Sequence, residues 1–451
     1  MELDLIKRVY FIGAGGIGMS ALARYFKKRG CLVGGYDKTS TVLTRTLEDE
    51  GILISYADEL SSLPAEFKVT AKNTLIVYTP AIPADAVLLN YFRDNGFDLQ
   101  KRSQVLGIIS KGQFCIAVAG THGKTTTSSI VAHILTDTGY GCTAFLGGIT
   151  TNYQSNFLLG DNNVVVVEAD EYDRSFLTLH PDIAVITSMD ADHLDIYGDA
   201  EQLHESFHLF AKQLKANGVL FFKEGLPLEE GITYGAGTDS VVEALNIRVE
   251  EGTFVFDYRD ETVSIQDIPL MLPGKHNIEN ATVAMATALK LGIDPEKVKA
   301  AIASFKGVKR RFEYIVREDK HVYIDDYAHH PEELRACFDA VRQLYPDKKM
   351  TVVFQPHLFS RTRDFADNFA QVLSTVDELL LLDIYPAREL PMEGIDAEFL
   401  LAKLTLKNSK VYKKEEVLMY IKESQPELLV TVGAGDIDTL IQPLKKILTN
   451  V

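Results

Sequence analysis

Apolar and polar residues follow one another along the chain in blocks that predict alternating strands and helices. The stretch "RVYFIGAGGIGMSALARYFKKRG", residues 8–30, starts with a β-branched and aromatic run, passes a glycine turn and continues with amphipathic helical spacing up to Gly30. The run "CLVGGYD" follows as the next strand, and the alternation continues to about Lys111. Because strands that alternate with helices form parallel sheets, residues 1–110 predict one α/β domain.

A second series of blocks begins after residue 110. The strand "FCIAVAG" precedes the helix "KTTTSSIVAHILTDTG", and the runs "NVVVVE", "DIAVIT" and "GVLFF" predict further strands. Between residues 230 and 270 the pattern changes to short alternating runs, which are typical of hairpins and predict a patch of antiparallel sheet. The helical "NIENATVAMATALKLG" follows, so residues 111–312 predict a central domain.

The last part of the chain repeats the α/β pattern after "GVKRRFE". Strand-like runs at "HVYIDD", "KMTVVFQPH", "ELLLLDIYP" and "ELLVTVGAGD" are separated by helical patterns or loops, which predicts a third domain over residues 313–451. A chain of 451 residues with 46% apolar residues is long enough for three domains, each with its own core.

Composition restricts the class of protein. A net charge of −17 argues against a large surface for nucleic acid or anionic membrane, since both require a basic face. Apolar runs stay below the roughly 18 residues that span a bilayer, and "MELDLIKRVYF" lacks signal-peptide features. We therefore expect a soluble cytoplasmic protein without membrane insertion. The cysteines lack metal or disulfide spacing and are expected to be reduced, buried side chains: Cys31, Cys115, Cys142 and Cys337.

The segment "AVAGTHGKTTTSS", residues 117–129, is similar to a phosphate-binding loop. The strict pattern G-x-x-x-x-G-K-[ST] requires a glycine at position 118, where this chain has valine. The other required residues are present as Gly123, Lys124 and Thr125. In such a loop backbone N–H groups face the anion, the lysine adds a positive charge, and the hydroxyl that follows it holds Mg²⁺. The segment predicts a nucleoside triphosphate site; the alternative is a glycine-rich turn with a surface lysine.

A second glycine-rich loop, "GAGGIG", fits G-x-G-x-x-G at Gly13, Gly15 and Gly18, with Asp37 at the end of the next strand. Taken alone, this loop suggests a nicotinamide- or flavin-dependent dehydrogenase, which is the alternative from another class. A nucleoside diphosphate attached to a sugar satisfies the same loop, and the second nucleotide site favours that interpretation.

Two acidic clusters follow neighbouring strands of the central domain. The first contains Glu168, Asp170, Glu171 and Asp173, and the second contains Asp190, Asp192, His193 and Asp195. Because the carboxyl ends of parallel strands lie beside a phosphate loop, these groups predict a Mg²⁺-triphosphate site. Solvated loop acids are the alternative. The segments "GKHNIENA", "GVKRRFE" and "DDYAHHP" add amide, guanidinium and imidazole groups, each of which could also be a helix cap or a surface group.

The motifs together resemble the Mur ligase family, the ATP-dependent amino acid ligases of bacterial cell-wall assembly. The resemblance covers all three predicted domains and is carried, in order, by "GAGGIGMSALA", "AGTHGKTTT", "EADEYDRSFL", "DADHLDIYG", "PGKHNIENA", "KGVKRRFE", "DDYAHHPEE" and "FQPHLFSRTRD". It implies an α/β fold with an N-terminal Rossmann-like UDP-sugar-binding domain and a central P-loop ATPase-type domain, in which a small antiparallel sheet joins the parallel one. A Rossmann-like domain that binds the amino acid follows.

Within the family, the segments are most similar to members that join L-alanine to UDP-N-acetylmuramate. The alternative is the member that reattaches recycled murein tripeptide to the same nucleotide sugar. The resemblance implies that the lactyl carboxylate attacks the γ-phosphate of ATP to form an acyl phosphate, which the amine of L-alanine then attacks. The products are UDP-N-acetylmuramoyl-L-alanine, ADP and phosphate. Such a reaction depends on positioning and on charge neutralisation, and we expect a monomer or weak homodimer.

The resemblance also implies roles for individual residues. Those expected at ATP are Gly120, Thr121, His122, Gly123, Lys124, Thr125, Thr126, Asn277, Asn280, Arg311 and Asp326. Two Mg²⁺ ions are expected, and their expected ligands are Thr125, Glu168 and His193. The UDP diphosphate is expected at Gly13, Gly15 and Gly18, and the amino acid at Arg361, Arg363 and His330. The expected catalytic set is Lys124, Glu168, His193 and His330.

This sequence departs from the family pattern at two positions. Several members carry a carbamylated lysine fourteen residues after the motif histidine, where this chain has Phe207. In the pattern "PHRxxRT" Leu358 replaces the first arginine, so part of the amino acid clamp is missing. Arg361 matches the second arginine and is expected to hold the alanine carboxylate, with His330 near the amine, because a guanidinium binds a carboxylate bidentately.

Overall fold

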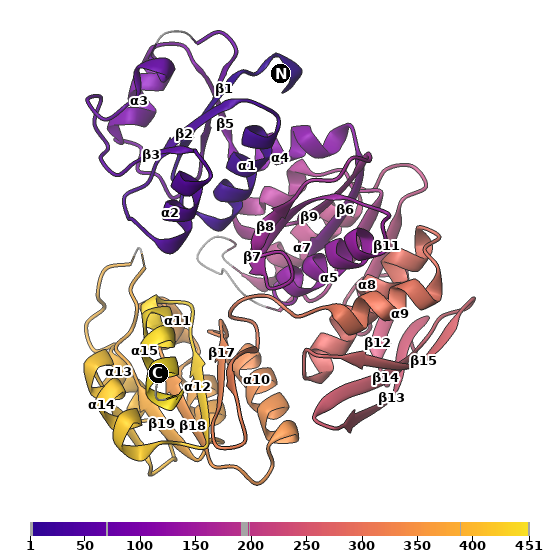
Figure 1. The fold of residues 1–451 in the computed structure, drawn as a ribbon, viewed down its shortest axis with the longest axis vertical. Helices are drawn as coiled ribbons and strands as arrows, with labels where there is room; N and C mark the ends of the chain where they lie inside the picture. The colour runs from indigo at the N-terminus through magenta and orange to yellow at the C-terminus, as the bar shows by residue number, and fades with distance from the viewer. Residues whose placement is uncertain (1–2, 69–70, 191–196, 198, 388, 450–451) are drawn as a thin grey trace. The chain divides into compact units, whose positions relative to one another are not determined.

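The computed structural model describes residues 3–68, 71–190, 197, 199–387 and 389–449, and every structural statement below concerns these residues. They contain three separate sheets of five, ten and six strands (Figure 1). The chain divides into two compact units: residues 1–246, 256–268 and 279–305 form the first, and residues 247–255, 269–278 and 306–451 form the second. The first unit contains the five-stranded sheet and most of the ten-stranded sheet.

The N-terminal sheet is entirely parallel and has the strand order β3-β2-β1-β4-β5. Its strands are β1 (Arg8–Ile12), β2 (Leu32–Tyr36), β3 (Leu53–Ser55), β4 (Thr74–Tyr78) and β5 (Asp98–Lys101). Its helices are α1 (Ile17–Lys28), α2 (Val42–Asp49), α3 (Val87–Asp94) and α4 (Arg102–Lys111), with short 3-10 turns η1 (Leu3–Leu5) and η2 (Ala65–Phe67). This order matches five of the six strands of the doubly wound order 3-2-1-4-5-6 and confirms the predicted Rossmann-like arrangement.

The central sheet has the order β15-β14-β13-β12-β11-β10-β6-β9-β7-β8. Its strands are β6 (Phe114–Ala119), β7 (Thr143–Thr150), β8 (Ser155–Leu158), β9 (Val164–Glu168), β10 (Ile183–Ile186), β11 (Val219–Lys223), β12 (Ile232–Ala236), β13 (Val242–Glu250), β14 (Thr253–Arg259) and β15 (Ser264–Leu270). Its helices are α5 (Lys124–Asp137), α7 (Ala200–Ala211), α8 (Lys275–Lys290) and α9 (Pro295–Ser304), with the 3-10 turn η3 (Tyr172–Thr178).

The hairpin expected between residues 230 and 270 is present as β13 and β14. Glu251 and Gly252 connect the two strands, and both have positive φ, as a two-residue hairpin turn requires. These strands are not a separate patch, because β13 pairs in parallel with β12 and so continues the ten-stranded sheet.

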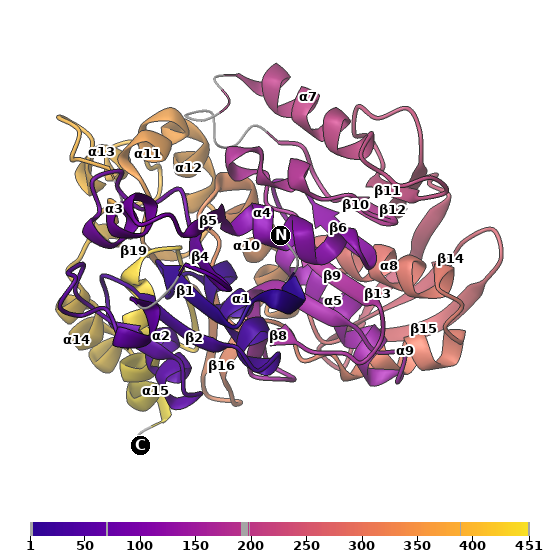
Figure 2. The same cartoon turned by 90° about the horizontal axis from the view of Figure 1, so that it is seen from above.

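Helix α1 joins the N-terminal sheet to the central sheet by packing against β7 and β8 (Figure 2). The ring of Tyr25 on α1 lies 5.5 Å from Phe145 and 6.2 Å from Phe157, so both sheets share one apolar core. A buried polar contact adds to this core: Asn156 on β8 donates to the carbonyl of Ile17 at 2.6 Å and accepts from the Arg24 guanidinium.

The C-terminal sheet has the order β16-β17-β21-β18-β19-β20, with only β16 antiparallel to its neighbour. Its strands are β16 (Glu313–Arg317), β17 (Val322–Asp326), β18 (Met350–Phe354), β19 (Glu378–Leu381), β20 (Ser409–Val411) and β21 (Leu428–Val432). Its helices are α10 (Pro331–Leu344), α11 (Phe359–Asp364), α12 (Ala366–Leu373), α13 (Ala397–Leu401), α14 (Lys414–Ser424) and α15 (Ile441–Thr449), with the 3-10 turn η4 (Asp436–Leu440).

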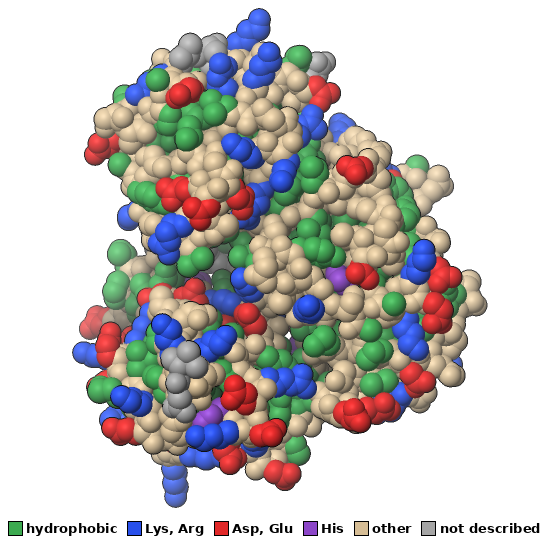
Figure 3. All heavy atoms as spheres, in the orientation of Figure 1, with side chains coloured by type: hydrophobic (Ala, Val, Ile, Leu, Met, Phe, Trp, Pro, Cys, Tyr) green, Lys and Arg blue, Asp and Glu red, His purple; other side chains and the backbone are tan. Residues whose placement is uncertain are grey.

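The distribution of charged side chains and the burial of the cysteines agree with the expectations from composition. Basic and acidic side chains are interspersed on the face drawn in Figure 3. None of the helices in the described part of the chain combines the length and hydropathy needed to span a bilayer. All four cysteines are buried free thiols, as expected, and burial raises the pKa of Cys115 and of Cys142 to about 12.

Candidate functional site

The phosphate-loop segment forms a tight turn between the buried strand β6 and helix α5. Gly120 and Gly123 have φ values of +138° and +82°, which other residues rarely adopt. Neither position has room for a side chain: a Cβ on Gly120 would lie 2.1 Å from the Thr187 hydroxyl, and one on Gly123 would lie 2.8 Å from Asn280 Oδ1. The turn therefore requires both glycines.

The residue that departs from the strict loop pattern lies inside the strand. Val118 is fully buried in β6, and its neighbours on the two adjacent strands are Glu168 and Val185. The turn starts at Gly120, two residues later, where the positive φ occurs. A glycine is therefore unnecessary at position 118.

Hydroxyl groups hold the loop against the end of β10. The backbone N–H of His122 donates to Ser188 Oγ at 2.7 Å, and the hydroxyls of Thr121 and Ser188 are 2.9 Å apart. The Thr187 hydroxyl donates to the His122 carbonyl, and His122 Nε2 lies 3.7 Å from an Asp190 carboxylate oxygen. The second acidic cluster therefore begins beside the loop, as predicted.

Lys124 is the first residue of α5, and its amine is enclosed. Its Nζ atom donates to the Gly120 carbonyl at 2.6 Å and lies 2.7 Å from Glu171 Oε2. Burial alone would lower the pKa of Lys124, but the carboxylates of Glu171, Asp170 and Glu168 outweigh it and hold that pKa above its ordinary value. The Lys124 amine therefore stays protonated and is paired with Glu171.

The next residue, Thr125, meets the end of β9. Its hydroxyl donates to Glu168 Oε1 at 3.0 Å, and the other oxygen of Glu168 accepts from the backbone N–H of Gly147 at 2.9 Å. A Cβ on Gly147 would lie 2.2 Å from this carboxylate, so the contact depends on glycine at that position. A carboxylate beside a hydroxyl at a phosphate loop fits a hard divalent cation such as Mg²⁺.

The other predicted metal ligand, His193, lies outside the described residues, as do Asp192 and Asp195. Within the described ranges no three His, Cys, Asp or Glu side chains gather as a metal cluster. Phe207, at the position of the family's carbamylated lysine, is fully buried with its ring 5.3 Å from Phe176, so this position belongs to the core.

The first glycine loop follows β1. Gly13 has a φ of +91°, and the backbone N–H of Gly15 donates to Asp37 Oδ2 at 2.8 Å. The predicted ribose carboxylate thus contacts the loop itself in this structure. A Cβ on Gly18 would lie 2.6 Å from an Arg102 Nη1 atom, so this guanidinium lies directly against the start of α1.

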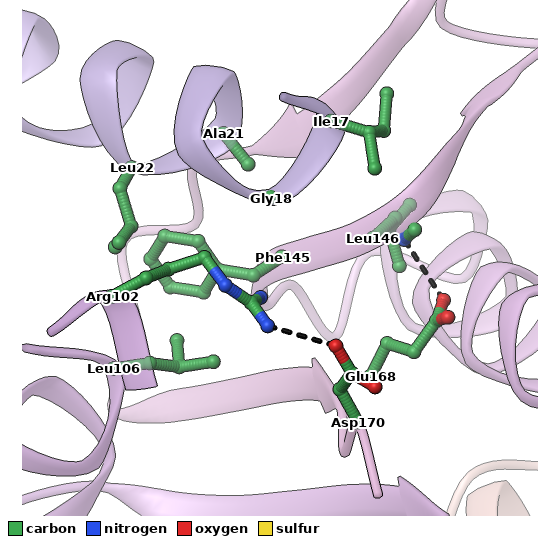
Figure 4. Close-up of a pocket in the computed structure, with 11 residues that line it drawn as sticks. Ile17, Gly18, Ala21, Leu22, Arg102, Leu106, Phe145, Leu146, Glu168 and Asp170 are labelled. Carbon is green, nitrogen blue, oxygen red and sulfur yellow. Dashed lines mark hydrogen bonds and ion pairs between the residues drawn. The ribbon is translucent and has the colours of Figure 1, made fainter. Parts of the chain in front are cut away.

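A pocket of about 140 Å³ lies between this loop and the central sheet (Figure 4). Leu22, Leu106 and Phe145 form apolar walls, whereas Arg102 and Glu168 provide charges. The Arg102 guanidinium pairs with Asp170 at 3.0 Å within the pocket. The pocket is bordered by Gly18 of the first loop and by Glu168, which contacts Thr125 of the second.

The two asparagines of α8 have different surroundings. Asn280 Oδ1 accepts from the Thr127 hydroxyl at 3.0 Å and lies under Gly123, so it supports the phosphate loop. Asn277 belongs to the second compact unit, and its side chain donates to the Pro273 carbonyl at 2.7 Å. Both side chains are buried.

The second unit gathers the remaining predicted residues near the ends of β17 and β18. The carboxylate of Asp326 accepts from the backbone N–H of Phe312 and of Ala328, each at 2.7 Å, and burial raises its pKa above the ordinary value despite nearby Arg311. Arg311 stacks over the Tyr327 ring at 5.2 Å. Asp326 and Arg311 therefore lie close together in this unit, and their roles at ATP remain predictions.

His330 is the N-cap of α10: its Nδ1 atom accepts from the Glu332 N–H, while Glu333 accepts from the His330 N–H. The neighbouring His329, which the sequence analysis did not select, lies 3.4 Å from Glu333, and its ring is 5.6 Å from the His357 ring. Burial lowers the pKa of His329 to about 4, so this imidazole is neutral near pH 7.

The two arginines of α11 differ in exposure. Arg361 is 7% exposed, and its Nη1 atom lies 3.5 Å from His357 Nδ1. The Arg363 side chain is 52% exposed and pairs with the adjacent Asp364, as a surface ion pair does. Leu358, which precedes the helix, has a φ of +72°, an unusual backbone conformation for leucine.

Comparison with known proteins identifies the class of this fold and site. Residues 8–114 match the description "Mur ligase family, catalytic domain", residues 118–288 match "Mur ligase middle domain", and residues 310–435 match "Mur ligase, glutamate ligase domain". The chain belongs to the Mur ligase family and is an ATP-dependent carbon-nitrogen ligase. The dehydrogenase alternative is therefore wrong.

Individual relatives are similar over their whole length. UDP-N-acetylmuramate–L-alanine ligase of Flavobacterium psychrophilum is 54% identical over 446 residues, covering 99% of each chain. The enzyme with the same name from Flavobacterium johnsoniae is 52% identical over 448 residues, again covering 99% of each chain. A UDP-N-acetylmuramate-alanine ligase structure from Thermotoga maritima has a TM-score of 0.84 and 26% identity, with 98% of each chain covered.

Proposed function

We propose that this enzyme joins L-alanine to the lactyl carboxylate of UDP-N-acetylmuramate at the expense of ATP, in peptidoglycan biosynthesis. The phosphate loop carries the proposal: a buried, positively charged Lys124 lies beside the Thr125–Glu168 contact at the start of α5. The names of relatives at 46–54% identity support this choice of substrates. The murein-tripeptide alternative has weaker support, because a murein peptide ligase structure from Psychrobacter arcticus shares the fold at 23% identity.

The proposed reaction has two steps on one acyl group. The lactyl carboxylate attacks the γ-phosphorus, the bond to the ADP oxygen breaks, and an acyl phosphate forms. The neutral amine of L-alanine then attacks the acyl carbon, and the tetrahedral intermediate loses phosphate and a proton to give the amide. The protein's main task is to hold two anions together, which Lys124 supports by neutralising charge on the phosphate oxygens.

We assign the metal to the oxygen atoms at the loop. Thr125 and Glu168 would hold Mg²⁺, with His193 as the proposed ligand of a second ion, and the bound metal would supply further positive charge at the phosphate. Gly147 positions Glu168 by donating its N–H. Gly120 to Gly123, with Thr126 behind them, provide the backbone groups and helix N-terminus for the phosphates.

The nucleotide sugar is assigned to the N-terminal domain. Gly13, Gly15 and Gly18 would allow the diphosphate to approach the backbone, and Arg102 would supply a cation at the same loop. The pocket between Gly18 and Glu168 would receive the sugar end, which places its carboxylate toward the Thr125–Glu168 contact. This arrangement gives each glycine loop its own nucleotide.

We also assign the remaining predicted residues to the other groups of ATP and to L-alanine. We assign Asn277 and Asn280 to adenine, Arg311 to the phosphates and Asp326 to the ATP ribose. For L-alanine we assign Arg361 to the carboxylate and favour His329 over His330 near the amine, since His330 caps α10 whereas burial keeps His329 neutral. We propose domains over residues 1–110, 111–312 and 313–451, a monomer or weak homodimer, and a cytoplasmic location, where ATP and nucleotide sugars are available.

Lys124→Ala tests the proposal. The variant should lose phosphate release by at least about 100-fold, since a buried charge at the transferring phosphate is removed, while UDP-N-acetylmuramate still binds. The assay contains ATP, Mg²⁺ and UDP-N-acetylmuramate, with a panel of free amino acids and murein tripeptide. Lys111→Ala, at an exposed lysine ending α4, is the matched control and should retain full activity. Turnover with tripeptide but not with L-alanine would contradict the proposed substrate.

A further inference from the structure

Two neighbouring acidic residues pair with the cations of two different nucleotide loops. Glu171 contacts Lys124 of the phosphate loop, and Asp170 contacts Arg102, which lies against Gly18 of the first glycine loop. Both acids lie within three residues of the end of β9, and all of these residues belong to the first compact unit. We call Asp170 and Glu171 the acidic turn.

Both carboxylate oxygens of Glu171 contact the Lys124 amine. Oε2 lies 2.7 Å from Nζ and Oε1 lies 2.9 Å from it, and the Glu171 side chain is only 1% exposed. A triphosphate that binds this loop needs the same amine. Because one ammonium group offers three donors and already donates to the Gly120 carbonyl, phosphate oxygens and the Glu171 carboxylate compete for it.

Asp170 has the equivalent relation to the other loop. Its Oδ2 atom lies 3.0 Å from an Nη2 atom of Arg102, inside the pocket next to Gly18 (Figure 4). An anionic group of a nucleotide sugar at this loop would attract the same guanidinium, since arginine binds phosphate and carboxylate in a fork geometry. Asp170 and that anion therefore compete for Arg102.

Backbone hydrogen bonds anchor the two acids to the same short segment. The carbonyl of Asp170 accepts from the Phe176 N–H at 2.9 Å, and the carbonyl of Glu171 accepts from the Arg174 N–H at 2.9 Å. Both carbonyls are thus fixed to η3, where Asp173 and Arg174 have positive φ values of 54° and 53°. Asp170 and Glu171 are therefore consecutive residues of one anchored turn, and a shift of that turn would change both side-chain contacts.

We propose that the acidic turn couples the two nucleotide sites. Phosphate on Lys124 displaces Glu171, and the resulting shift of Asp170 releases Arg102 for the anion of the nucleotide sugar. The reverse sequence operates when the nucleotide sugar binds first, because coupling between two sites is reciprocal. This inference rests on the proposed function, since it requires ATP and UDP-N-acetylmuramate as the two ligands.

Calorimetric titration tests the coupling. The dissociation constants of a non-hydrolysable ATP analogue and of UDP-N-acetylmuramate are measured with Mg²⁺, each alone and with the other ligand at saturation. In the wild type each ligand should tighten the other by at least about fivefold. Asp170→Asn should bind the nucleotide sugar more tightly than wild type, Glu171→Gln should bind the ATP analogue more tightly, and both should reduce the coupling factor to about one.

Asp173→Asn is the matched control. It removes the same charge from the same segment, where Asp173 pairs with the half-exposed Lys101 at 3.3 Å, and it should keep the wild-type coupling factor. Asp170 is itself 38% exposed, so Asp170→Asn remains informative even if Glu171→Gln fails to fold. An unchanged coupling factor in Asp170→Asn, or no coupling in the wild type, overturns the inference. Failure of the wild type to bind UDP-N-acetylmuramate contradicts the proposed function itself.

Discussion

At the scale of single residues, two arginines of the C-terminal unit that were both expected at the amino acid differ in exposure. Arg361 and Arg363 are two positions apart on the short helix α11, yet only Arg361 is buried, next to His357. Arg363 points to solvent and pairs with Asp364. A buried guanidinium beside an imidazole can receive a free carboxylate, whereas the exposed pair gains little from one.

We therefore expect Arg361→Lys to raise the Michaelis constant for L-alanine by at least about tenfold, equivalent to about 1.4 kcal/mol. A lysine keeps the charge but loses the fork that binds a carboxylate through two hydrogen bonds. Steady-state kinetics with varied L-alanine, at saturating ATP and UDP-N-acetylmuramate, measure this change. Arg363→Lys is the control and should behave as wild type; the opposite result would move the carboxylate contact to Arg363.

The sequence identified residues whose role follows from local pattern and missed those whose role follows from folding. Lys124 and Thr125 were predicted because strand, glycine turn and helix are contiguous in the chain. The specific pairing of Glu171 with Lys124 could not be predicted, since nothing in "EADEYD" shows which acid reaches the loop. Arg102 and His329 were missed for the same reason. Their partners, Asp170 and His357, are close in space but distant in sequence.

At the scale of elements, strand β7 positions the metal site through one glycine. Gly147 lies on β7 two strands from the phosphate loop, and its N–H fixes the Glu168 carboxylate that meets Thr125. The sequence signal was limited to the pair of glycines in "FLGGIT", which is compatible with any close backbone approach. Only the sheet order places this pair beside the end of β9.

Gly147→Ala is expected to lower the maximal rate by at least about tenfold and to raise the Mg²⁺ concentration needed for half-maximal activity. The new Cβ would lie 2.2 Å from the Glu168 carboxylate, which must then leave the Thr125 hydroxyl. Gly112→Ala is a matched control, because a Cβ there meets no atom within 4 Å. Activity assays over a Mg²⁺ series provide the measurement, and equal profiles for both variants would show that Glu168 does not hold the metal.

The elements themselves were largely predictable, because apolar periodicity differs between strand and helix. What the pattern could not give was the pairing of strands far apart in sequence. The hairpin β13–β14 was expected, but its continuation from β12 into a sheet of ten strands was not. Strand partners depend on which edges remain open after the rest of the sheet has formed, and local alternation contains no information about that.

At the scale of the whole molecule, the sequence predicted three domains, whereas the described residues form three sheets within two compact units. The N-terminal and central sheets share a unit because α1 packs against β7 and β8 through aromatic side chains. The amphipathic pattern of α1 predicted that one face is buried, but it did not predict that α1 also packs against the central sheet. The division into a UDP-sugar domain, an ATP domain and an amino acid domain remains a prediction.

The polar contact between α1 and β8 provides a test of this association. Asn156 is fully buried, donates to the Ile17 carbonyl at 2.6 Å and to Ser20 Oγ at 3.1 Å, and accepts from Arg24. Its removal leaves buried polar groups without their partner, so Asn156→Ala should lower the free energy of unfolding by about 1–3 kcal/mol, as measured by urea denaturation. Gly18, which follows Ile17, lines the proposed nucleotide-sugar pocket.

Asn156→Ala should therefore also raise the Michaelis constant for UDP-N-acetylmuramate, by at least about threefold or roughly 0.7 kcal/mol, with little change for L-alanine. Asn162→Ala is the matched control: its amide donates to the Tyr140 and Gly141 carbonyls at 2.8 and 2.7 Å, so it loses a similar number of hydrogen bonds away from α1. The control should lose stability without a change in this Michaelis constant. Equal Michaelis constants in the two variants would mean that the contact between α1 and β8 contributes only to stability and does not position the first glycine loop.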